Sequence, residues 1–100
     1  MAFRYIFVKE AQDEYEKALY WYLERSFTAA ENFIKQVDYT LSLICAHPLR
    51  WRNEVENYFE LNLKRSPFTI IYVISENEKL IVVTSLYHHK KNPEKKYRKS

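Results

Sequence analysis

Not one of the 100 residues of this chain is glycine. Glycine reaches positive φ angles without steric cost, and it makes up about 7% of an average protein. Its absence excludes the phosphate-binding loops that depend on it, namely the Walker A loop, the dinucleotide-binding fingerprint and the GXXG clamp of KH domains. Turns have to be built from asparagine, proline, serine or helix caps instead. We therefore expect no cofactor, and we expect any bound nucleic acid to be contacted by side chains.

The length and composition indicate a single domain over residues 1–100 without covalent or metal cross-links. Apolar residues make up 47% and charged residues 29% of the chain, as in folded globular proteins. Cys45 alone forms neither an internal disulfide nor a multi-cysteine zinc site. No segment approaches the roughly 20 apolar residues of a membrane span, and the first residues lack the apolar core of a signal peptide. We expect a cytoplasmic protein that binds no membrane and no metal.

Basic charge is concentrated at the C-terminal end. The net charge is +3, but residues 88–100 carry six Lys or Arg against Glu94 alone, a net +5. The other 87 residues carry ten basic and twelve acidic side chains, a net −2. Such a cluster is suited to nucleic acid or to an acidic partner. The alternative is a solvated, frayed tail.

The first half of the chain predicts a strand and a helical hairpin. Residues 3–8 are aromatic and β-branched, which is typical of a strand. Ser26 or Thr28 begins a second helix, where Thr28 and Glu31 have the spacing of a capping box, and Pro48 ends it. The first helix carries an apolar stripe at Ala11, Tyr15, Ala18, Leu19, Tyr22 and Leu23. Its early turns carry four acids that we expect to form a solvated face, Glu10, Asp13, Glu14 and Glu16.

The second half predicts strands. After a loop over residues 48–56, apolar and polar residues alternate over 59–64, as in a strand with one wet face. Residues 68–74 and 80–86 are almost entirely apolar, which indicates central strands. The turn between them has Asn77 in the position usually taken by glycine. The predicted fold is α+β with the order β-α-α-β-β-β, a helical hairpin packed on one face of a small antiparallel sheet.

Three segments on this topology resemble the RelE/ParE superfamily, the toxins of type II toxin–antitoxin modules. The first is the acidic helix with spaced tyrosines over residues 11–24, AQDEYEKALYWYLE. The second is residues 63–74, LKRSPFTIIYVI, where a basic pair precedes Pro67 and Phe68. The third is residues 86–97, LYHHKKNPEKKY, with histidine, a basic pair, Asn-Pro and a final aromatic. The resemblance covers nearly the whole chain and is closer to the ParE-like, plasmid stabilisation branch.

This resemblance implies one of two activities. RelE-like toxins cleave messenger RNA on the ribosome without a metal, using basic residues and a terminal aromatic, whereas ParE-like toxins inhibit DNA gyrase. Both are neutralised by a cognate antitoxin that folds on the toxin, and the complex binds operator DNA through the antitoxin. The sheet ends and the helical hairpin are expected to offer an apolar groove for that antitoxin. Thr69 stands where RelE-like toxins have a central arginine, and this departure favours the gyrase activity.

Histidine titrates near neutrality, so His88 and His89 are candidates for acid–base catalysis. Because successive strand residues point to opposite faces, only one of them is expected to face a given site. In a RelE-like enzyme Lys91 would supply charge and Tyr97 would stack on a base or act as an acid. The candidates for contact with nucleic acid or with the target are Lys64, Arg65, Lys90, Lys95, Lys96 and Arg98. The alternative is that the histidines lie on the surface and that Tyr97 docks the tail onto the core.

Three functions therefore stand open. The favoured one is a ParE-like toxin that inhibits DNA gyrase. The second is a RelE-like, metal-independent mRNA interferase that uses His88 or His89. The third is a protein of the same fold that has lost toxicity and acts only as a binding partner.

Overall fold

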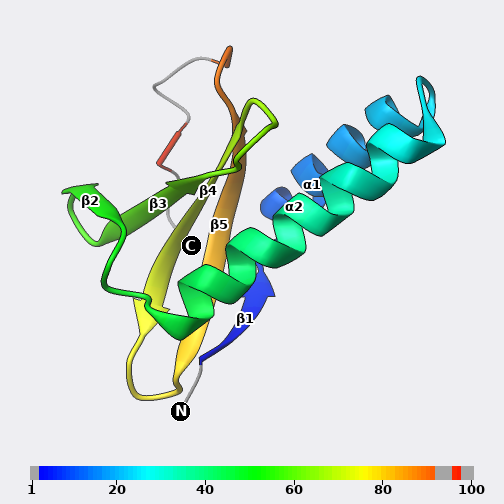
Figure 1. Cartoon of the computed structure of the whole chain (residues 1–100). Coiled ribbons are helices and arrows are strands. Elements are labelled where there is room, and N and C mark those ends of the chain that lie inside the picture. The colour runs from blue at the N-terminus through cyan, green and yellow to red at the C-terminus, as the bar shows by residue number, and fades with distance from the viewer. Residues whose placement is uncertain (1–2, 92–95, 98–100) are drawn as a thin grey trace.

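The computed structural model describes residues 3–91 and 96–97, and within these ranges the chain forms two helices and five strands (Figure 1). No helix in this part of the chain combines the length and the apolar character needed to cross a membrane. In chain order the elements are β1 (Arg4–Phe7), α1 (Lys9–Leu23), α2 (Phe27–Ala46), β2 (Arg52–Val55), β3 (Tyr58–Asn62), β4 (Phe68–Ser75) and β5 (Leu80–His88).

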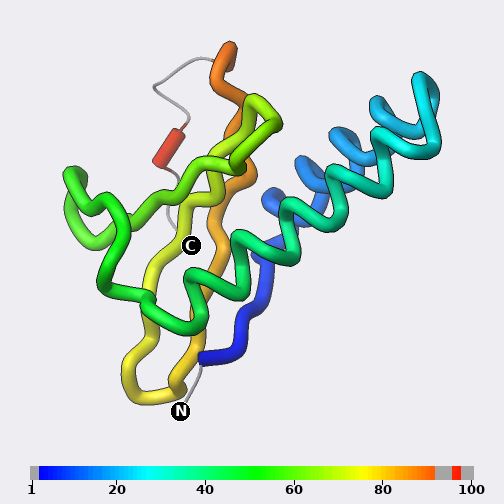
Figure 2. Tube along the Cα trace, viewed as in Figure 1, coloured from blue at the N-terminus to red at the C-terminus, as the bar shows by residue number. Residues whose placement is uncertain are grey.

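The strands form one sheet in the order β1-β5-β4-β3-β2, with β1 parallel to β5 and all other neighbours antiparallel. The predicted fold class is confirmed, with a helical hairpin on one face of a mostly antiparallel sheet (Figure 2). The structure adds β2, an edge strand within the segment expected to be a loop. Three of its four residues are exposed, so it carries no apolar alternation by which the sequence could reveal it.

The core lies between the hairpin and the sheet. Helix α2 contributes its buried stripe, and the ring of Phe33 stacks between Tyr15 and Tyr22 of α1, with ring centroids 5.7 and 5.0 Å away. Alternate residues of the strands complete the core, which includes Ile70, Tyr72, Ile81, Val83 and Leu86. The opposite side of the sheet, here called the open face, has a smaller cluster around Tyr58, Ile71 and Tyr87.

The structure confirms Ser26, one of the two expected residues, at the start of α2, whereas the expected capping box and turn residue are wrong. Ser26 is the N-cap of α2, and its hydroxyl accepts a 3.2 Å hydrogen bond from the backbone N–H of Ala29. The helix begins at Phe27, so Thr28 lies inside its first turn and the Thr28–Glu31 capping box is wrong. Asn77 does not take the left-handed position either. Lys79 takes it after the β4–β5 turn, with φ of 52°.

A β-bulge in β5 determines which side chains face the helices. Ile71 pairs with Ser85 and Tyr72 pairs with Val83, which leaves Thr84 as an extra residue. Val83 and Leu86 consequently both belong to the helix-side core, although three positions separate them. The bulge therefore reverses the alternation of β5 just before its C-terminal end.

Candidate functional site

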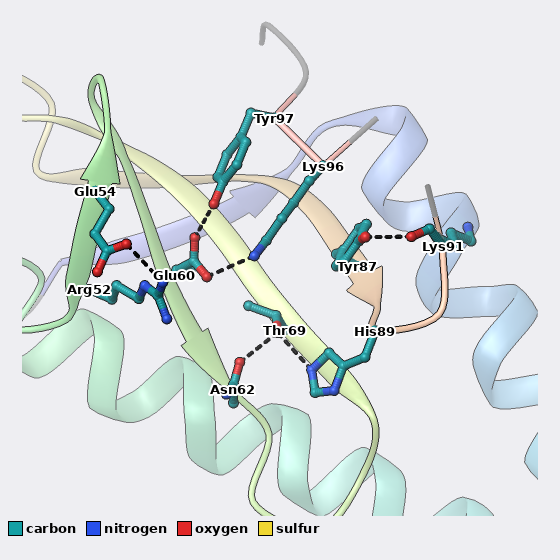
Figure 3. A network of polar contacts seen from close by, with 10 residues as sticks. All are labelled: Arg52, Glu54, Glu60, Asn62, Thr69, Tyr87, His89, Lys91, Lys96 and Tyr97. Atoms are coloured by element: carbon teal, nitrogen blue, oxygen red, sulfur yellow. Dashed lines mark hydrogen bonds and ion pairs between the residues drawn. The ribbon is translucent and has the colours of Figure 1, made fainter. Parts of the chain in front are cut away.

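The two histidines at the end of β5 lie on opposite faces of the sheet. The ring of His88 contacts Phe68 of the helix-side core edge-on, with the ring centroids 5.0 Å apart. His89 turns to the open face, where its Nε2 lies 2.9 Å from the hydroxyl oxygen of Thr69 (Figure 3). The histidines therefore cannot serve one site together. The pKa of His88 is lowered by burial and then by the positive charges of its neighbours, which favours its neutral form.

Thr69 on β4 makes side-chain hydrogen bonds both to β3 and to the segment after β5. Its hydroxyl donates a 2.6 Å hydrogen bond to Oδ1 of Asn62 on the neighbouring strand. A hydroxyl has one proton, so the contact with His89 requires the histidine Nε2–H as donor. This assignment leaves Nδ1 of a neutral His89 as the acceptor that a ligand would meet. Thr69 thus orients His89 on the open face.

A buried carboxylate lies beside this group on the open face. The Glu60 side chain on β3 is only 8% exposed, and it accepts hydrogen bonds from Lys96 Nζ at 3.0 Å and Tyr97 OH at 2.5 Å (Figure 3). Arg52 is its cross-strand neighbour on β2 and also binds Glu54, with 2.8 Å between Nη2 and Oε1. Glu60 therefore gathers two candidate residues of the C-terminal end onto β3.

The carboxylate of Glu60 and the positive charges of Lys96 and Arg52 stabilise each other's ionised forms. Burial raises the pKa of Glu60, but hydrogen bonds from Tyr97 and Lys96 and the charges of Lys96 and Arg52 outweigh it and leave the pKa below its ordinary value. Burial lowers the pKa of Lys96, yet its contacts with Glu60 raise it overall. The pKa of Tyr97 is raised by burial and by Glu60. Glu60 and Lys96 are thus an ion pair, and Tyr97 is a neutral donor to it.

Sequence reasoning missed Glu60, because the alternation in β3 places it on the face expected to be wet. Its burial comes from Lys96 and Tyr97, which lie 36 and 37 positions further along the chain. No local pattern records such a contact. Glu54 and Glu60 look alike in the sequence, yet the side chain of Glu54 is 65% exposed.

A second group lies on the helix side of the bulge. Glu14 of α1 accepts hydrogen bonds from the Ser85 hydroxyl at 3.1 Å and the Leu86 backbone N–H at 3.0 Å. The ammonium of Lys91 lies 3.7 Å from the same carboxylate. With its side chain 13% exposed, Glu14 departs from the solvated face expected for the acids of α1. It holds the bulge from the helix side of the sheet and draws the Lys91 ammonium to that side.

His88 and Lys91 border a cavity of about 460 Å³ between α1 and the ends of β4 and β5. Its walls are mostly apolar, and Lys17 and Trp21 line it from the helix. This is the groove that the sequence predicts between the sheet end and the helical hairpin. The remaining wall residues are Glu14, Ala18, Tyr22, Pro67, Phe68 and Leu86.

Lys64 and Arg65 occupy the β3–β4 loop and border a different cavity of about 310 Å³ against α2. Gln36 of α2 holds this loop through its Oε1, which accepts from the Arg65 backbone N–H at 3.1 Å and the Ser66 hydroxyl at 3.0 Å. Lys90 is exposed after β5, where its backbone N–H donates to His88 Nδ1 at 3.0 Å.

Lys95 and Arg98 lie outside the described residues. In the part of the chain that the structure describes, no three His, Cys, Asp or Glu side chains are grouped so as to hold a metal ion. The structure therefore brings His89, Lys96 and Tyr97 to the open face and places His88, Lys91, Lys64 and Arg65 elsewhere.

Comparison with known proteins gives a family and a fold. Residues 5–93 match the family described as the ParE toxin of the type II toxin–antitoxin system parDE. No curated protein matches the chain. Solved structures with the same fold include the isolated RelE toxin of E. coli, at 16% identity and a TM-score of 0.64, covering 92% of this chain and 89% of that one.

Two solved toxin–antitoxin systems are similar as well. The RelBE2 complex from Mycobacterium tuberculosis has 16% identity and a TM-score of 0.60, covering 88% of this chain and 99% of that one. The chromosomal ParDE system from P. aeruginosa has 18% identity and a TM-score of 0.60, covering 88% and 96%. At these identities the structural likeness establishes the fold, whereas the family match covers most of the sequence.

Proposed function

The chain belongs to the ParE toxin family of type II toxin–antitoxin systems, and from this membership we propose that it inhibits DNA gyrase and is neutralised by a cognate antitoxin. Both encounters would take place in the cytoplasm. Inhibition by binding would need a surface of defined shape rather than a set of reacting groups.

The separation of the candidate catalytic residues carries this proposal. RNA cleavage by a 2′-hydroxyl needs a base, an acid and cations around one phosphate. Here His88 and Lys91 lie on the helix side of the sheet, while His89 and Tyr97 lie on the open face. Tyr97 already donates its proton to Glu60. This arrangement favours a toxin that binds its target over one that cleaves RNA.

The cavity between α1 and the strand ends is the seat that we propose for the antitoxin. Its apolar walls suit the apolar side of an amphipathic segment, and the ammonium groups of Lys17 and Lys91 at its border suit acidic side chains beside it. An antitoxin tail that is disordered when free would fold as it enters this cavity. The complex would bind operator DNA through the antitoxin.

Purified gyrase tests the activity directly. We expect the toxin to inhibit supercoiling of relaxed plasmid, and we expect equimolar antitoxin, added first, to restore it. In cells, induction should produce filamentation and a DNA-damage response while mRNA stays intact. Rapid mRNA loss with unchanged supercoiling activity would contradict the proposal.

One observation favours RNA cleavage as a second candidate function. His89, Lys96 and Tyr97 share the open face, so a candidate for acid–base catalysis, a cation and an aromatic ring lie on one side of the sheet. If this face cleaves RNA, His89→Gln and Tyr97→Phe should each abolish mRNA loss upon induction, and His88→Gln should not. Harmless overexpression of the wild-type chain without antitoxin would instead indicate a binding protein that has lost toxicity.

A further inference from the structure

We propose that Glu60 determines specificity on the open face by occupying, with its own carboxylate, the anion site that Lys96 and Tyr97 form, so that this face rejects RNA phosphate. This inference goes beyond the proposed inhibition of gyrase and does not depend on it. It concerns a residue for which the sequence predicted no role.

The donors of this site all converge on one carboxylate. Lys96 donates to Oε1 of Glu60 at 3.0 Å and Tyr97 donates to Oε2 at 2.5 Å, so each oxygen already has a donor. An ammonium and a phenol on a planar pair of oxygens are also the donors that a phosphate would attract. Arg52, opposite Glu60 on β2, adds a positive charge that acts on Glu60, while its own hydrogen bond goes to Glu54.

Burial makes the occupation stable. The side chains of Glu60 and Lys96 are 8% and 23% exposed, so water screens their attraction less than that of a surface pair. A phosphate that approached Lys96 would either meet a second negative charge or have to displace Glu60 from it. Displacement would leave a buried carboxylate without its partners, which is costly. Lys96 is therefore basic in the sequence but unavailable to a polyanion.

Lys90 provides the contrast within the same basic segment. It is exposed, and none of the ion pairs among residues 3–91 and 96–97 involves it. Lys90 and Lys96 add the same charge to the sequence, yet the Lys90 side chain is exposed and the Lys96 ammonium is paired with Glu60. Among the described residues after β5, Lys90 therefore stands outside these ion pairs, whereas Lys91 pairs with Glu14 and Lys96 with Glu60.

The test is the affinity of the full chain for a short single-stranded RNA, measured by fluorescence anisotropy at low salt. Glu60→Gln keeps the shape of the side chain and removes its charge. We expect it to bind RNA about tenfold more tightly than the wild type, with a salt dependence steeper by about 0.7 in log–log slope, because the ammonium of Lys96 becomes available. Glu76→Gln is the matched control, since it makes the same change in net charge at an exposed position in the β4–β5 turn. Equal affinities of the two variants would overturn the proposal.

A second measurement uses the wild type, in case Glu60→Gln does not fold. When RNA is titrated into labelled protein, backbone amide shifts should move at Lys90 and stay fixed at Glu60, Lys96 and Tyr97. Saturable shifts at Lys96 and Tyr97 would show that the site accepts phosphate, and would overturn the proposal. Neither measurement involves gyrase or antitoxin, so the result is independent of whether gyrase is the target.

Discussion

The hydroxyl of Tyr97 donates a 2.5 Å hydrogen bond to the carboxylate of Glu60, a residue 37 positions earlier on β3. Through this bond the C-terminal segment is attached to the open face of the sheet. The Tyr97 ring also packs against Tyr58, with 5.4 Å between the ring centroids. The last aromatic residue of the chain therefore covers part of the smaller apolar cluster, and its contribution to stability is measurable.

Replacing Tyr97 with phenylalanine removes the phenol and keeps the ring. A hydrogen bond to a charged group contributes roughly 1.5–3 kcal/mol when buried, and Tyr97 is only half-buried. We expect Tyr97→Phe to lower the free energy of unfolding by about 1 kcal/mol in urea denaturation. Tyr20→Phe is the control, because Tyr20 is 65% exposed on α1. An equal loss of unfolding free energy in both variants would contradict a contribution of the Tyr97–Glu60 hydrogen bond to stability.

From the contacts of Glu60 with Lys96 and Tyr97 we predict how the stability of the protein depends on pH. The pKa of Glu60 is lower in the folded protein than in the unfolded chain, so folding favours the ionised form. Its stabilisation is fully present above the unfolded pKa of about 4.3 and is lost as the pH falls through the folded pKa. We expect wild type and Glu60→Gln to differ in free energy of unfolding at pH 7 and to converge as the pH falls below about 4.3. A pH-independent difference would assign the effect to packing alone.

Glu14 supports the bulge in β5. Glu14→Ala would leave the backbone N–H of Leu86 without its acceptor in a buried position, at a cost of about 1–3 kcal/mol in unfolding free energy. Glu14→Gln retains an acceptor oxygen and should lose less. Glu16→Ala on the exposed side of α1 is the control, with an expected change below about 0.5 kcal/mol. Equal stability of Glu14→Ala and Glu16→Ala would refute the supporting role.

Trp21 tests the proposed antitoxin seat. Its side chain lines the cavity beside α1 but is 50% exposed, so truncation should leave the fold intact. We expect Trp21→Ala to weaken antitoxin binding about tenfold in calorimetry, as for an aromatic anchor at an interface. Tyr39→Ala removes an aromatic that is 58% exposed on α2, outside this cavity, and should bind as the wild type does. The reverse order of affinities would place the antitoxin on α2.

The left-handed turn residue offers a test of backbone strain. Lys79 has φ of 52°, a conformation that costs a residue with a Cβ roughly 1 kcal/mol and costs glycine almost nothing. We expect Lys79→Gly to raise the free energy of unfolding by about 0.5 kcal/mol, because the greater entropy of the unfolded glycine offsets part of the relief. Glu78→Gly, at a position without positive φ, should be destabilising. Thermal denaturation of the two variants distinguishes them.

The architecture could be predicted from the sequence because its signals are local and periodic. The apolar stripes of α1 and α2 and the continuous apolar runs of β4 and β5 each record one buried face. The short strand β2 could not be predicted, since it pairs at an edge with exposed side chains. Asn77 failed as the left-handed residue because the turn extends to Lys79 before β5 begins.

The candidate site could be predicted only in part. The basic segment is visible in composition, and the opposite orientation of His88 and His89 follows from strand geometry. Which face each one takes depends on the extra residue at Thr84, and which lysine is neutralised depends on Glu60. Both depend on contacts between segments that lie far apart in the chain, and local sequence patterns do not reveal such contacts.

The bulge at Thr84 means that backbone pairing, and not only residue identity, sets what the end of β5 displays. If Thr84 paired with Ile71 in simple alternation, every later residue would shift by one position and the two histidines would exchange faces, with no change to the sequence LYHHKK itself. Two homologous chains with identical C-terminal motifs could then present different chemistry to the same partner. In this fold the presence or absence of a bulge inside the last strand carries as much functional information as a substitution in the motif that follows it.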